Sequence, residues 1–118
     1  MAPKIQSFER VVPMIYAYNT PSVLYNEGWT KIGYTEKQTV EQRIYQQTHT
    51  AGIQAVLAWK DNAMYKDGSG QYFTDHDFHA YLETEAASER RPGTEWFHLD
   101  GNTSLQYFNR FAWRMGVD

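Results

Sequence analysis

The chain has 118 residues, no cysteine and a formal net charge of −3. This length predicts a single domain with a modest core, and the lack of cysteine excludes disulfides, thiolate zinc sites and cysteine nucleophiles. The acidic charge argues against a protein that coats nucleic acid by bulk electrostatics, although a local basic patch is compatible with it.

The sequence contains neither a membrane span nor a targeting segment. No apolar run approaches the roughly 18 residues that a membrane-spanning helix needs, and the N-terminal stretch MAPKIQSFERVVPM has no signal-peptide core. We therefore expect a soluble, cytoplasmic protein that does not contact membranes. Aromatic residues make up 16% of the chain, which favours a binding surface because Tyr and Trp offer both contact area and a polar group.

The first part of the chain predicts a loose lead-in followed by an antiparallel hairpin. Residues 1–12 form the lead-in. The stretch MIYAYN (14–19) has the β-branched and aromatic content of a strand, and WTKIGYT (29–35) predicts a second strand. The segment 20–28 between them contains Pro, Asn and Gly and is typical of a loop.

Alternation along these two strands groups four candidate site residues. Successive side chains of a strand point to opposite faces, so Tyr16 and Tyr18 share one face of the first strand. Lys31 and Gly33 share one face of the second strand for the same reason. A glycine at position 33 allows a side chain or a phosphate to approach the sheet closely.

The rest of the chain alternates helices with short apolar runs. Thr39 and Gln42 form a capping-box pattern, which predicts a helix that begins after the threonine. Thr74 can cap a further helix. The predicted elements are a helix at 39–48, a strand at 53–60, a loop at 61–72, a helix from Thr74 to about Glu85, a loop at 87–94, a short strand or extended edge at 95–99 and an amphipathic helix at 102–115.

This order of elements predicts a small α/β (α+β) domain. We expect a central mixed or antiparallel three-stranded sheet that is flanked by helices. The regular βαβ alternation and the glycine-rich phosphate loop of a nucleotide-binding fold are absent from the sequence.

The stretch QYFTDHDFHAYL places two aspartates and two histidines at the start of the helix that follows Thr74. On a helix, Asp75 and His79 are four residues apart and His76 and His79 are three apart, so both pairs are surface neighbours. His79 then either ligates the ion that Asp75 holds or fixes the Asp75 carboxylate by a hydrogen bond. The alternative is structural, because Thr74, Asp75 and Asp77 are typical of a helix N-terminus. His76 is then a surface residue.

Five short motifs follow one another along the chain. They are MIY at 14–16, KIGYT at 31–35, an arginine in the next helix, an acidic residue four positions before a histidine, and EWF at 95–97. This arrangement resembles the GIY-YIG nuclease superfamily, in the branch whose second motif reads KIG and which resembles the N-terminal modules of bacterial helicase- and restriction-type proteins. The resemblance spans residues 13–99. The helical segment 100–118 is expected to lead into further domains of a longer protein or to support a homo-oligomer.

The resemblance implies a DNA endonuclease that cuts phosphodiesters with one divalent metal ion, Mg²⁺ or Mn²⁺. By position, Tyr16 matches the tyrosine of the first motif, and Tyr16 or Tyr18 positions or deprotonates the attacking water. An ordinary tyrosine has a pKa of about 10, so this role needs a nearby cation such as Lys31. Arg43 matches the helix arginine and binds the scissile phosphate through two hydrogen bonds, which a lysine cannot do. His79 has a supporting role.

The same resemblance assigns the metal ligand and the DNA contacts. Asp75 matches the metal-binding glutamate of the family, and a single carboxylate suits Mg²⁺ because this ion keeps most of its waters. The residues implied in DNA contact are Gly33, Tyr34, Arg43 and His49.

Four positions depart from the family pattern. Met14 stands where the first motif has glycine, and Lys31 replaces the tyrosine of the second motif, as is usual in the KIG branch. Asp75 is one methylene shorter than glutamate, and Gln47 occupies the place of a histidine often found four residues after the arginine. These changes bear more on the implied activity than on the fold, because fold and activity are separate inferences.

Structural interpretations of the same residues stay open. Arg43 can form an ordinary helix ion pair with Glu36 or Glu41. Tyr16 can serve in half-buried sheet packing, and Glu95 is either a second site carboxylate or a rim residue. Two other functions are also compatible with the sequence: a catalytically inactive nucleic-acid-binding or targeting module, and a metal hydrolase with a non-nucleic substrate, which rests on the Asp/His cluster alone.

Overall fold

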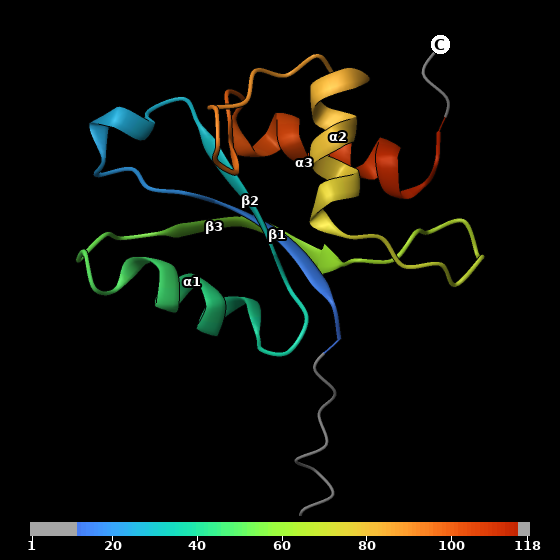
Figure 1. Ribbon diagram of the computed structural model, residues 1–118, viewed down its shortest axis with the longest axis horizontal. Coiled ribbons are helices and arrows are strands. Elements are labelled where there is room, and N and C mark those ends of the chain that lie inside the picture. The colour runs from blue at the N-terminus through green and yellow to red at the C-terminus, as the bar shows by residue number, and fades with distance from the viewer. Residues whose placement is uncertain (1–11, 116–118) are drawn as a thin grey trace, which may run out of the picture.

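The computed structural model describes residues 12–115, which fold into one sheet with helices on both of its faces (Figure 1). The α/β class predicted from the sequence is confirmed. Of the lead-in predicted at 1–12, only residue 12 lies in the described part. In chain order the elements are β1 (Met14–Asn19), the 3₁₀ helix η2 (Leu24–Asn26), β2 (Thr30–Thr35), α1 (Val40–Thr48), β3 (Val56–Asn62), α2 (Asp75–Thr84), β4 (Trp96–Phe97) and α3 (Gly101–Ala112).

The sheet is antiparallel and has the strand order β3-β1-β2-β4. The prediction of three strands is wrong by one, because β4 pairs with β2 through Thr30↔Phe97 and Lys31↔Trp96. A two-residue strand has no side-chain alternation of its own, so its place in the sheet depends on this distant pairing. Beyond these two pairs, the outer edge of β2 carries no further strand among the described residues.

Capping residues set the starts of the helices as the sequence predicts. At α1, the Gln42 backbone N–H donates to Thr39 Oγ1 at 3.1 Å, and the Thr39 N–H donates to Gln42 Oε1 at 2.9 Å. At α2, the Thr74 N–H donates to Asp77 Oδ2 at 2.9 Å. These side chains satisfy backbone donors that a helix start leaves unpaired.

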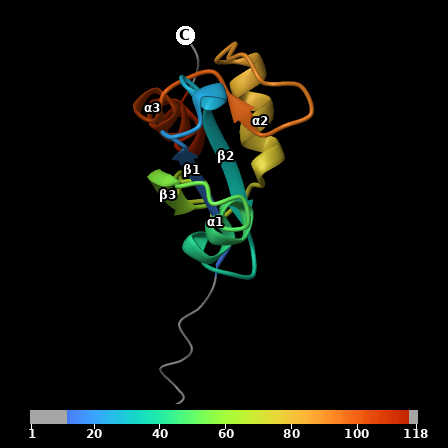
Figure 2. The ribbon, with the colours of Figure 1, turned by 90° about the vertical axis from the view of Figure 1, so that its left-hand side faces the viewer.

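The sheet separates two packed layers, with α1 on one face and α2 and α3 on the other (Figures 1 and 2). The larger core lies under α2 and α3 and contains Phe78 and Phe108 against Trp59. The Trp59 indole N–H donates to Ser104 Oγ at 2.8 Å, which satisfies a buried polar pair. The smaller cluster faces α1 and consists of Tyr16, Tyr18 and Val40 with partly buried neighbours.

Helix α3 belongs to the same packed unit as the sheet, because its Phe108 and Phe111 lie in the larger core. Two further aromatic residues at this helix lie in different environments. Tyr107 packs against the core, whereas Trp113 at the helix end is exposed. None of the helices in residues 12–115 is long and apolar enough to cross a membrane.

Candidate functional site

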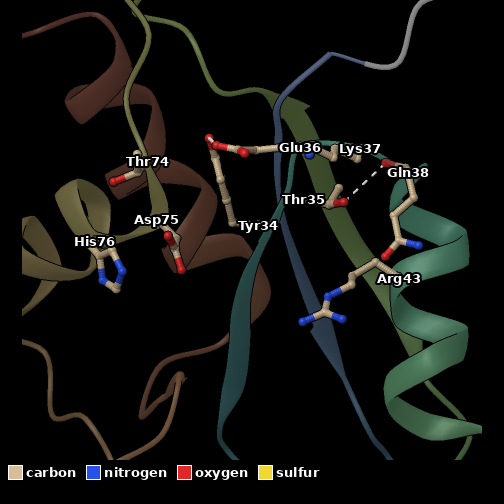
Figure 3. Close-up of a pocket in the computed structure, with 9 residues that line it drawn as sticks. All are labelled: Tyr34, Thr35, Glu36, Lys37, Gln38, Arg43, Thr74, Asp75 and His76. Atoms are coloured by element: carbon tan, nitrogen blue, oxygen red, sulfur yellow. Dashed lines mark hydrogen bonds between the residues drawn. The ribbon is translucent and has the colours of Figure 1, made fainter.

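An open groove of about 550 Å³ lies between the start of α1 and the start of α2 (Figure 3). Arg43 reaches into it from α1, and Asp75 and His76 line it from α2, on the other side of β2. The end of β2 and the following turn form its floor and rim, and the remaining lining residues are Tyr34, Thr35, Glu36, Lys37, Gln38 and Thr74. The groove therefore joins two candidate residues that are far apart in the sequence and come from opposite faces of the sheet.

Arg43 is free of the ion pairs that the structural interpretation requires. Glu41 pairs instead with Lys60 at 2.7 Å, and Glu36 accepts a hydrogen bond from the Tyr34 hydroxyl at 3.0 Å. Within residues 12–115, the Arg43 side chain makes a long hydrogen bond of 3.5 Å to Gln46 Oε1, and its guanidinium lies close enough to the Tyr16 hydroxyl to lower the pKa of that group, against the larger effect of burial. Its guanidinium is thus available to an anion in the groove.

Tyr16 and Tyr18 form a buried pair beside α1. Their rings stack with centroids 6.1 Å apart, and both hydroxyls donate to Gln47 Oε1, at 3.3 Å from Tyr16 and 3.1 Å from Tyr18. Tyr16 is 0% exposed and Tyr18 is 2% exposed. The common face predicted for the two tyrosines is confirmed, but Gln47 covers their hydroxyls in this conformation.

The tyrosine hydroxyls hold their protons tightly. Burial raises the pKa of Tyr16 to about 12, although Arg43 acts in the opposite direction. Burial also raises the pKa of Tyr18, and the neighbouring Tyr16 and Glu95 add to this effect. Both side chains are therefore neutral hydrogen-bond donors near pH 7, which is the wrong protonation state for a general base.

Gly33 provides the space that Tyr16 occupies. The two residues are cross-strand partners, and a Cβ at position 33 would lie 2.3 Å from Tyr16 Cζ. The sequence-based expectation that a side chain approaches the sheet at this glycine is therefore confirmed. The tyrosine ring fills the space, however, so this surface of Gly33 is closed to DNA.

Lys31 lies at the border of the tyrosine pair. Its Nζ is 3.7 Å from Glu95 Oε1 and 5.9 Å from the centroid of the Tyr18 ring. Burial lowers the pKa of Lys31, the Glu95 carboxylate raises it, and the nearby Arg43 guanidinium lowers it again, with a net shift below the ordinary value. Among Tyr16, Tyr18 and Lys31, Lys31 is thus the residue whose pKa is lowered.

The two remaining residues implied in DNA contact have different positions. Tyr34 lines the groove, and burial together with its bond to Glu36 raises its pKa to about 12. His49 is the C-cap of α1, where its ring stacks on Tyr45 with centroids 4.3 Å apart. It is not among the groove-lining residues, so the structure does not bring His49 to the other candidates.

The acidic residues at the start of α2 have separate roles. Asp77 accepts the Thr74 N–H and closes the helix start, as the structural interpretation expects. The Asp75 carboxylate makes no hydrogen bond or ion pair within residues 12–115, and the residue lines the groove. The helix cap therefore explains Asp77 and leaves Asp75 free to bind a cation.

His79 is buried beneath the groove and fixed by β2. Its Nε2 lies 2.9 Å from the Ile32 carbonyl oxygen, whereas its Nδ1 is buried without a hydrogen-bond partner. Burial lowers the pKa of His79, so the neutral imidazole is favoured. The structure contains no hydrogen bond between His79 and the Asp75 carboxylate, so that alternative is wrong.

The acidic residue predicted as metal ligand has two histidines beside it. Asp75, His76 and His79 each offer a ligand atom, and these atoms lie within 4.8 Å of one another. The Asp75 carboxylate fits Mg²⁺ as a single ligand, because this ion keeps most of its waters. Asp75, His76 and His79 are thus the residues that could hold a metal ion here.

Two contacts of the site were not predicted from the sequence. Gln47 accepts hydrogen bonds from both tyrosine hydroxyls. Its place near the site could have been predicted, because it follows Arg43 by four residues and so lies on the same face of the helix. The pairing of Glu95 with Lys31 depends on where β4 joins β2, which no local pattern encodes.

Comparisons of the chain with protein-family models, with curated proteins and with solved structures find no match. The resemblance to the GIY-YIG superfamily therefore stays a prediction.

Proposed function

We propose that this protein is a DNA endonuclease that hydrolyses phosphodiester bonds with a divalent metal ion. The observation that carries the proposal is the shared groove, in which an unpaired Arg43 faces the side of the groove that holds Asp75. A guanidinium for the phosphate and a carboxylate for a cation are the two groups that phosphodiester hydrolysis most needs.

Charge around Arg43 favours an anionic ligand. Arg43 lies close enough to Lys31 to lower its pKa, so the two cations repel each other, and Glu95 compensates only one of them. A phosphate between them would relieve this repulsion. The whole chain has a net charge of −3, and Glu36 and Asp75 line the groove beside Lys37 and Arg43. Recognition of DNA would therefore depend on these cations and on a metal ion that neutralises the carboxylates.

Each residue of the proposed site has its own role in the reaction. Arg43 binds the scissile phosphate and stabilises the charge that develops on it. Asp75 would hold the metal ion, which when bound supplies charge neutralisation and assistance to the leaving oxygen. Tyr16 and Tyr18, as neutral donors, orient the attacking water or a phosphate oxygen once Gln47 releases them. Lys31 accepts the proton of the water in the fraction of molecules in which it is neutral, because its pKa lies below the ordinary value, whereas the pKa of both tyrosines is raised.

Lys31→Arg tests the proton-accepting role, because arginine keeps the charge but does not deprotonate in proteins. We expect this variant to lose roughly two orders of magnitude or more in cleavage rate. In the wild type, the rate should rise with pH as Lys31 loses its proton, and it should level off above its lowered pKa. The matched control is Lys60→Arg, which lies on β3 and pairs with Glu41. Cleavage by Lys31→Arg at the wild-type rate would assign Lys31 a purely electrostatic role.

Nicking of supercoiled plasmid by the purified chain tests the proposed function. The assay is run with Mg²⁺, with Mn²⁺ and with a chelator in place of metal. We expect nicked circles to accumulate with at least one of the metals and to disappear with the chelator. Accumulation that is unchanged by the chelator would contradict the metal-dependent mechanism.

A nucleic-acid-binding module without cleavage is the second candidate, and the burial of the tyrosines favours it. Tyr16 is 0% exposed and hydrogen-bonded to Gln47, so it cannot touch a substrate unless this contact opens. This candidate predicts that DNA binds with a steep salt dependence, that Arg43→Ala weakens binding, and that no nicks form with any metal. The nicking and binding assays together separate the two candidates.

A further inference from the structure

The start of α2 brings three side chains that carry metal-ligating atoms close together. Asp75 and His76 are adjacent in sequence, and His79 follows one helical turn later, so Asp75 and His79 are i,i+4 neighbours. Their ligand atoms lie within 4.8 Å of one another.

His79 shows an unsatisfied polar atom that points to a ligand. Its side chain is 1% exposed, and Nδ1 has no hydrogen-bond partner although it is buried. A buried polar atom without a partner is unfavourable, and native structures contain few of them. The Thr74–Asp77 helix cap does not explain this atom, because the cap does not involve His79.

The contact on the other side of the ring fixes the tautomer of His79. A carbonyl oxygen can only accept, so the Nε2 atom that lies 2.9 Å from the Ile32 carbonyl carries the proton. The lone pair is then on Nδ1, the unpartnered atom. An imidazole whose second nitrogen donates to a backbone carbonyl is the usual arrangement of a metal-ligating histidine. Ile32 is itself held in place, because its N–H donates to the Glu95 carbonyl oxygen at 3.0 Å.

The donor set selects the class of metal. Two imidazole nitrogens and one carboxylate oxygen suit Zn²⁺, Co²⁺ or another first-row transition ion. Mg²⁺ instead prefers oxygen ligands and retains most of its waters. His76 is exposed and borders the groove, so coordination positions opposite the three side chains would face solvent and the ligand in the groove.

We propose that Asp75, His76 and His79 form a three-ligand site for a transition-metal dication such as Zn²⁺ or Co²⁺. The inference deepens the proposed function and rests on it for the use of the metal in cleavage. It adds His76, a residue that the sequence favoured as an ordinary surface histidine. It also replaces the expectation of Mg²⁺ with a preference for nitrogen-binding ions.

Co²⁺ binding to the untagged chain is the test, because Co²⁺ absorbs visible light with an intensity that depends on its ligands. We expect one Co²⁺ per chain, displacement by Zn²⁺ and no displacement by a large excess of Mg²⁺. His76→Ala should weaken Co²⁺ binding by roughly tenfold or more. Its fold should be unchanged because the side chain is exposed. Asp75→Asn should weaken binding as well.

His98→Ala is the matched control, since His98 is a surface histidine that pairs with Glu89 and stacks on Trp29. It should bind Co²⁺ as the wild type does. Equal Co²⁺ spectra and affinities for wild type and His76→Ala, or ready displacement of Co²⁺ by Mg²⁺, would overturn the inference. Nicking with Mg²⁺ by a chain that lacks the Co²⁺ site would leave the nuclease proposal standing, whereas His76-dependent Co²⁺ binding without nicking would support only the metal site.

Discussion

Arg43→Ala is expected to reduce DNA nicking by roughly 10²- to 10³-fold, the usual cost of removing one group that stabilises transition-state charge. The reason is that the Arg43 guanidinium has no carboxylate partner in residues 12–115 and reaches into the groove that Asp75 lines. Arg43→Lys should recover little of the activity, because lysine cannot form the paired hydrogen bonds of a guanidinium with a phosphate.

The measurement is the initial rate of plasmid nicking, with circular dichroism to verify that each variant is folded. Arg110→Ala is the control, since Arg110 lies in the last turn of α3 and does not line the groove. It should cut as fast as the wild type. Nicking by Arg43→Ala at the wild-type rate would remove Arg43 from the site and with it the main support for phosphate binding.

Gly33→Ala is expected to produce the largest loss of stability among the site variants. The added Cβ would meet Tyr16 Cζ at 2.3 Å and the Tyr16 hydroxyl at 2.4 Å. The ring has little room to move, because it is fully buried, stacked on Tyr18 and bonded to Gln47. Overpacking of this kind costs about 1–3 kcal/mol or more, which lowers the Tm of a domain of this size by about 10 °C.

A double-mutant cycle shows whether the Tyr16 ring causes this loss. Thermal unfolding is measured for Gly33→Ala in the wild type and in a Tyr16→Ala background, where the added methyl group has space. The cost of Gly33→Ala should be much smaller in the second background, because the two positions are in direct contact. An equal cost in both backgrounds would show that the strain lies elsewhere in β2.

Local sequence signals predicted the elements that carry their own start, end or periodicity. MIYAYN predicted β1 with its observed bounds, and the Thr39 capping pair predicted the start of α1. The strand expected at 53–60 is instead β3 (Val56–Asn62), and the predicted loop at 61–72 begins two residues too early. In this stretch the pairing of β3 with β1 decides the bounds, and a short apolar run does not encode such pairing.

The parts of the candidate site that follow from side-chain alternation in strands and from residue spacing in helices could be predicted from the sequence. The shared face of Tyr16 and Tyr18 and the close approach at Gly33 are consequences of the strand geometry. The burial of the tyrosine hydroxyls by Gln47 depends instead on how α1 packs on the sheet. The tautomer of His79 depends on the Ile32 carbonyl, 47 residues earlier in the chain. Tertiary contacts of this kind decide protonation states, which spacing alone cannot provide.

Arg43 from α1 and Asp75 from α2 are proposed to act on one phosphodiester in one groove. Nicking by Arg43→Ala, by Asp75→Asn and by the double variant, each compared with the wild type, tests this proposal. Residues that act as a unit are strongly non-additive, so each single variant should be nearly as slow as the double variant. Metal-dependent nicking that either single variant retains at the wild-type rate, or a folded wild type that cuts with no divalent metal, would contradict the claim.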